Sequence, residues 1–140
     1  IFTKQIFFRR HSQMINSKVL QEVQQHLTQA NRKYTEVEQK LEQHRMELNR
    51  AVITLRELKT LKQDDTCYQS VGRMFLLCDP VQLREQYEAK VVATQKEVDQ
   101  LKKISEHYAK QVREHQANLK EIFLAFRNQS NQQNNNDDDD

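Results

Sequence analysis

Apolar residues recur at alternating spacings of three and four positions within the range 16–62. Such a heptad repeat places one apolar stripe along a long helix that pairs with a second helix. Eleven of the twelve stripe positions are apolar, and His44 is the exception. The positions are Leu20, Val23, Leu27, Ala30, Tyr34, Val37, Leu41, His44, Leu48, Ala51, Leu55 and Leu58. The pattern predicts a first helix over 16–62.

A second stripe with the same spacing lies within the range 80–127. Pro80 suits the first turn of a helix, and Asp79 before it is a candidate N-cap. Nine of the twelve stripe positions are apolar. They are Tyr87, Val91, Thr94, Val98, Leu101, Ser105, Tyr108, Val112, His115, Leu119, Ile122 and Phe126. We therefore predict a second helix over 80–127.

The two stripes are equal in length, which favours an antiparallel pairing around the short connector. Facing residues of an antiparallel pair have position numbers with a constant sum. A sum of 142 gives every layer at least one apolar residue, with Leu41 facing Leu101 and His44 facing Val98. We predict a mostly α chain, folded as a long antiparallel coiled-coil hairpin. His44 and His115 are interpreted as polar residues in weakly packed layers of this seam, and not as metal ligands.

The connector, 63–79, predicts one β-hairpin. Gly72 and Arg73 fit a two-residue type II′ turn, so that Cys67 opposes Cys78. These cysteines are compatible with a cross-strand disulfide on oxidation or with two free thiols in a reducing cytosol. An isolated two-stranded hairpin is marginally stable in water and leaves its edges unpaired, so we expect it to complete a sheet with other chains. The predicted assembly residues are Tyr68, Val71, Gly72, Arg73, Met74, Phe75, Leu76 and Leu77.

Composition excludes several fold and function classes. One Gly and one Pro in 140 residues are too few for a sandwich or for repeated α/β loops, and no glycine-rich phosphate loop fits. A net charge of +2 and mixed-sign helices do not indicate nucleic-acid binding. No run approaches the ~18 apolar residues of a membrane span. We expect no cofactor, no metal and no membrane partner.

Both chain ends depart from the heptad pattern. Residues 1–15 are basic and contain no acid. We interpret them as a disordered or non-native extension, with Met14 a plausible natural start; a fragment of a transit peptide is the alternative. Residues 128–140 consist of Asn, Gln, Ser and Asp, which bury nothing, so this tail is expected to be disordered.

Between the two predicted helices the connector carries the pattern Asp-x-x-Tyr-x-x-Val-Gly-Arg-Met-Phe-x-Leu. The matching residues are Asp65, Tyr68, Val71, Gly72, Arg73, Met74, Phe75 and Leu77. In these features the range 16–127 resembles the β-type subunits of prefoldin. The resemblance implies a cytoplasmic assembly of two α-type and four β-type subunits, whose hairpins build a β-barrel platform. It also implies that the coiled-coil ends bind unfolded clients such as actin and tubulin and deliver them to the cytosolic chaperonin without ATP.

The helix ends far from the predicted connector carry more apolar residues than the seam needs. Phe123 and Leu124 lie off the seam and have no assigned partner. Together with the resemblance, this predicts a client-binding tip; the alternative is that both side chains pack on the end of their own coil. The predicted tip residues are Leu20, Val23, Leu27, Leu119, Ile122, Phe123, Leu124 and Phe126.

A second function class stays open, a structural coiled-coil tether or scaffold that forms homodimers through the hairpin. An enzyme is disfavoured because the sequence contains no nucleophile–base or metal-ligand constellation. The two remaining classes differ in assembly. A chaperone subunit joins unlike partners, whereas a tether associates with itself.

Overall fold

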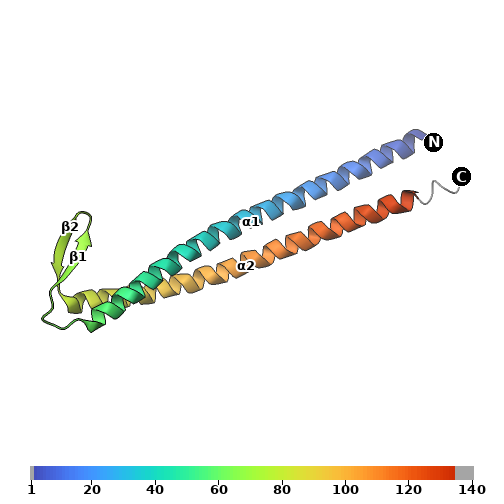
Figure 1. The fold of residues 1–140 in the computed structure, drawn as a ribbon. Coiled ribbons are helices and arrows are strands. Elements are labelled where there is room, and N and C mark those ends of the chain that lie inside the picture. Colours follow the sequence, from blue (N-terminus) through green and yellow to red (C-terminus); the bar gives the residue numbers. More distant parts are fainter. Residues whose placement is uncertain (1, 135–140) are drawn as a thin grey trace. The chain divides into compact units, whose positions relative to one another are not determined.

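Two long helices flank one β-hairpin along the chain. The computed structural model describes the backbone of residues 2–134 and the side chains of residues 17–131. The elements are helix α1 (Phe2–Thr60), strands β1 (Cys67–Val71) and β2 (Met74–Cys78), and helix α2 (Pro80–Asn134) (Figure 1). The two strands form an antiparallel sheet of their own. This arrangement confirms the predicted mostly α fold with one β-hairpin in the connector.

The helices are longer than predicted at the chain ends. α1 begins at Phe2 instead of 16, and α2 continues to Asn134 instead of ending at 127. Neither extension contains Gly or Pro, so each residue adds a backbone hydrogen bond to an existing helix at little cost. The backbone of the predicted extension, 1–15, is helical over 2–15, and that of the predicted tail, 128–140, is helical over 128–134. Residue 1 and the rest of the tail lie outside the described residues.

The chain divides into two compact units. One contains Ile1–Thr35 and Glu106–Asp140, and the other contains Glu36–Ser105 with the hairpin. We call these the end unit and the hairpin unit and describe each separately.

The core of the hairpin unit is a narrow seam between α1 and α2. Its buried residues are Leu41, Ala51, Leu58, Leu83, Thr94, Val98 and Ser105. The polar seam residue Ser105 donates a hydrogen bond to the Glu38 carboxylate, which satisfies its hydroxyl inside the seam. His44 Nδ1 lies 3.1 Å from Glu97 Oε2 on the facing helix, but the geometry is not that of a hydrogen bond.

The seam of the end unit is less deeply buried. Ala30 is its one buried apolar residue among those described. The His26 and His115 rings stack with centroids 5.9 Å apart, and Lys33 Nζ lies 5.9 Å from the centroid of the Tyr108 ring. Aromatic and imidazole rings therefore contribute to the contact between the helices of this unit.

The predicted heptads and their register are confirmed. All twenty-four predicted seam positions are buried or half-buried. Four contacts between the helices join residues whose position numbers add to 141, 142 or 143, close to the predicted 142. The ion pairs of the longer lysine side chains, Lys90 with Glu47 and Lys59 with Glu88, reach one turn further and add to 137 and 147. The alternation of three and four was therefore sufficient to identify the facing sides of α1 and α2 within each unit.

Candidate functional site

The β-hairpin has the register and the turn that the sequence predicts. Val71 pairs with Met74, and Cys67 pairs with Cys78. Gly72 has φ +62°, while Arg73 does not have positive φ, as a type II′ turn requires at its two central positions. A side chain at position 72 would meet no atom within 4 Å, so the backbone angle alone requires glycine.

Apolar side chains on both faces of the hairpin are exposed. Phe75 and Leu77 share one face with Tyr68, and Met74 and Leu76 lie on the other. The exposed fractions of the predicted apolar assembly residues lie between 47% and 73%. Within the described residues, β1 and β2 form a sheet of two strands, so each keeps one unpaired edge. Such a sheet can pair with further strands and bury both faces.

The base of the hairpin is held by polar groups at the helix ends. The backbone N–H of Lys62 donates to Asp65 Oδ2 at 2.7 Å as the chain leaves α1. Asp79 Oδ1 accepts a hydrogen bond of 3.1 Å from the N–H of Val81, which confirms Asp79 as the cap of α2. These two hydrogen bonds lie where the chain enters and leaves the hairpin.

Arg84 is a positioning residue that sequence reasoning did not identify. Its Nη2 donates to the carbonyl oxygens of Leu58 at 3.1 Å and Leu61 at 3.3 Å. Leu58 lies in the last turn of α1 and Leu61 directly after the helix ends, at the negative end of the helix dipole. The Leu58 carbonyl also accepts a hydrogen bond of 3.3 Å from the N–H of Leu61. Arg84 thereby ties the end of α1 to the first turns of α2.

Arg84→Met is expected to lower the free energy of unfolding by about 1 kcal/mol, because two carbonyls lose a charged donor while the aliphatic stem is kept. Urea unfolding followed by circular dichroism measures the change. Arg56→Met, at an exposed position of α1, is the matched control and should shift the free energy by less than about 0.5 kcal/mol. Equal effects of the two substitutions would contradict the role given to Arg84.

Gly72→Val is expected to destabilise the hairpin by about 1 kcal/mol, because a β-branched residue is strained at positive φ. Amide hydrogen exchange of β1 and β2 should become faster, while exchange in α1 and α2 stays unchanged. Ser70→Val is the control, because it adds the same side chain within a strand, where β-branched residues are favoured. Unchanged exchange in the Gly72→Val hairpin would contradict the assigned turn.

The predicted tip residues all lie in the end unit. Those on the seam are half-buried: Leu20, Val23, Leu27, Leu119, Ile122 and Phe126. Phe123 is 51% exposed and Leu124 is 48% exposed, so both remain available on the surface of the single chain. Beside them lies a small hollow of about 160 Å³, lined by Val19, Ile122, Ala125, Phe126 and Gln129. Val19 was not predicted, because it lies one position outside the heptad stripe.

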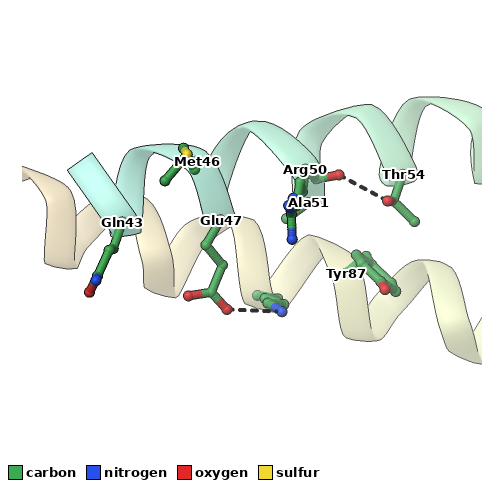
Figure 2. Close-up of a pocket in the computed structure, with 8 residues that line it drawn as sticks. Gln43, Met46, Glu47, Arg50, Ala51, Thr54 and Tyr87 are labelled. Atoms are coloured by element: carbon green, nitrogen blue, oxygen red, sulfur yellow. Dashed lines mark hydrogen bonds and ion pairs between the residues drawn. The ribbon is translucent and has the colours of Figure 1, made fainter. Parts of the chain in front are cut away.

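A larger groove of about 510 Å³ runs along the hairpin unit. Its lining residues are Gln43, Met46, Glu47, Arg50, Ala51, Thr54, Tyr87 and Lys90. The labelled residues of α1 line one side and Tyr87 of α2 the other (Figure 2). Lys90 Nζ pairs with Glu47 Oε1 across the groove at 3.1 Å. This pair links the two helices, and the eight lining residues contain no nucleophile held by a neighbouring base.

The described residues contain neither a metal-binding cluster nor a membrane-spanning helix. No group of three or more His, Cys, Asp or Glu side chains lies close enough to hold a metal ion. Neither helix, over the part that the structure describes, has an apolar stretch suited to crossing a membrane.

Comparisons with a family model and with a known relative both match this chain to prefoldin subunits. Residues 21–125 match the family model described as prefoldin subunit. The chain is 30% identical over 101 residues to Prefoldin subunit 1 of Arabidopsis thaliana, which covers 72% of this chain and 79% of the relative. Residues 71–75 predict a likeness to eukaryotic prefoldin subunit 1, and this match confirms it.

A solved structure has the same fold. The prefoldin beta subunit from Thermococcus strain KS-1 matches with a TM-score of 0.66 and 18% identity, covering 73% of this chain and 90% of that chain. The shared fold is the pair of long helices with one β-hairpin between them.

Proposed function

Because this chain belongs to the prefoldin family, we propose that it acts as a β-type subunit of a six-chain co-chaperone. Prefoldin subunits are chaperone subunits that assemble with other prefoldin subunits. The proposed complex contains two α-type and four β-type chains. It holds unfolded polypeptides such as actin and tubulin and delivers them to the cytosolic chaperonin.

The exposed hairpin is the observation that carries this proposal. Phe75 and Leu77 are 73% and 70% exposed on a two-stranded sheet, although large apolar side chains are costly to leave in water. In a barrel of hairpins from several subunits, neighbouring strands would pair with both edges and cover both faces. Pairing supplies backbone hydrogen bonds, and burial of the apolar residues supplies the driving force.

The end unit supports client binding. Phe123, Leu124 and the hollow beside Phe126 offer apolar surface without a fixed pattern of hydrogen-bond donors. Apolar burial is non-directional, so such a surface accepts many unfolded sequences at about 25 cal/mol per Å². Each tip alone is weak, and six tips acting on one client gain affinity through multivalency.

Client binding without ATP agrees with the sequence. The single Gly of the chain, Gly72, occupies the hairpin turn. No glycine therefore remains for a phosphate-binding loop in this subunit. The proposed release of the client depends on transfer to the chaperonin and not on nucleotide hydrolysis by this chain.

The test is the mass of the particle formed with and without α-type partners. We expect the chain alone to give small or polydisperse species, and a mixture with α-type and other β-type subunits to give one six-chain complex. Light scattering coupled to gel filtration measures both masses. A stable homodimer that ignores the α-type subunits would overturn the proposal and favour the tether.

A further inference from the structure

Cys67 and Cys78 face each other at the open end of the hairpin. Cys67 is the first residue of β1 and Cys78 the last residue of β2, and they are direct partners in the register. Both are free and half-buried. They close the segment that contains every predicted assembly residue, so a bond between them would enclose the whole hairpin.

The two thiols share one face of the sheet. Cys78 Sγ donates to Gln69 Oε1 at 3.6 Å and to the carbonyl oxygen of Leu76 at 3.4 Å. Gln69 lies two residues after Cys67 in β1, so the side chains of both point to the same face. The contact between Cys78 and Gln69 therefore places the Cys78 sulfur on the face of Cys67.

The backbone spacing suits a covalent bond. Directly opposed residues in an antiparallel pair have Cα atoms about 4.5 to 5.5 Å apart. A disulfide spans Cα distances of about 4.4 to 6.8 Å. We propose that Cys67 and Cys78 form a reversible oxidation site, at which a low-molecular-weight disulfide such as oxidised glutathione converts the two thiols into a cross-strand disulfide.

The reaction is a pair of thiol–disulfide exchanges. The thiolate of one cysteine attacks a sulfur of oxidised glutathione, breaking its S–S bond and releasing one glutathione thiolate. The thiolate of the other cysteine then attacks the protein sulfur of this mixed disulfide and releases the second glutathione. Two electrons pass from the cysteine sulfurs to glutathione, and the two thiol protons end on the released glutathione molecules.

The bond would order the hairpin in the free subunit. The closed loop, counted from Cys67 to Cys78, holds twelve residues. Closing a loop of this length lowers the conformational entropy of the open hairpin. Opening of the hairpin thereby becomes about a hundredfold less favourable. An unpaired two-stranded hairpin is marginally stable, so the oxidised subunit would present pre-ordered strands to its partners.

Tryptic peptide mapping tests the bond directly, because Arg73 lies between the two cysteines. The isolated full chain is equilibrated with reduced and oxidised glutathione, and remaining thiols are then blocked by alkylation. We expect peptides 63–73 and 74–84 to be joined in the monomer fraction and to separate on reduction. Only mixed disulfides with glutathione, or only bonds between chains, would overturn the proposal.

A register-shifted variant is the matched control. Leu77→Cys combined with Cys78→Ser keeps two thiols but moves one to the face of Tyr68. At the same glutathione ratio, we expect the original pair to close at least tenfold more than the shifted pair. Equal closure would show that chain flexibility and not the hairpin register joins the thiols, and would overturn the proposal.

Amide exchange tests the ordering. In the oxidised chain, exchange at Gln69 and Leu76 should slow by about ten- to hundredfold, and reduction should reverse the change. Unchanged exchange in the closed chain would overturn the ordering role. None of these readouts needs a partner subunit, so failure here is distinct from failure of the proposed co-chaperone function.

Discussion

Phe75→Asp is expected to abolish entry of the chain into a complex with other prefoldin subunits while leaving the isolated chain as stable as before. In the single chain Phe75 is 73% exposed, so an aspartate there remains hydrated. In an assembled sheet the same carboxylate would be buried without a partner, which costs several kcal/mol. The yield of complex after mixing with α-type and β-type partners, measured by gel filtration, should fall to background.

Val92→Asp on α2 is the matched control, because Val92 is 71% exposed and lies outside the hairpin. Both substitutions replace an equally exposed apolar side chain by a carboxylate. Val92→Asp should assemble normally, and neither variant should change the free energy of unfolding by more than about 0.5 kcal/mol. Normal assembly of Phe75→Asp would show that the hairpin is not the assembly surface, although membership of the family would stand.

The seam and the hairpin were predictable because each rests on a short-range repeat. The alternation of three and four marks the buried stripe of a helix whatever the partner, so Leu41, Ala51 and Leu58 are buried as expected. The hairpin register follows from a single turn: once Gly72 and Arg73 are central, every strand pair is set. The heptad repeat and the two turn residues are therefore enough to predict the fold.

Polar contacts between the helices were not predictable in this way. Ser105 counts as a weak layer in a heptad, and nothing in the repeat indicates that Glu38 supplies its hydrogen-bond partner. An arginine in the first turns of a helix is an ordinary residue in such a pattern. The role of Arg84 depends on where α1 ends, because it donates to a carbonyl there. Val19 lies next to the stripe and lines the hollow together with Ile122 and Phe126. Such contacts depend on side-chain reach and helix ends, which a repeat does not encode.

Phe123→Ser combined with Leu124→Ser is expected to weaken binding of an unfolded client by about five- to thirtyfold while leaving assembly intact. Each side chain is half exposed in the end unit. Removing about 1 to 2 kcal/mol of apolar burial from the tip gives this range, since about 1.4 kcal/mol corresponds to a factor of ten. The assembled complex should also need a higher concentration to suppress aggregation of chemically unfolded actin, measured by light scattering.

Met46→Ser combined with Ile53→Ser is the control that separates position from apolar content. Met46 is 51% exposed and Ile53 is 43% exposed, and both lie in the hairpin unit. If exposed apolar area anywhere on the helices held clients, the two double variants would lose affinity equally. Because the proposed site is local to the helix ends, only the Phe123 and Leu124 pair should matter. Equal losses would mean that exposed apolar area anywhere on the helices binds clients. Undiminished suppression by the Phe123→Ser and Leu124→Ser complex would mean that these two side chains pack on their own coil and that clients bind elsewhere.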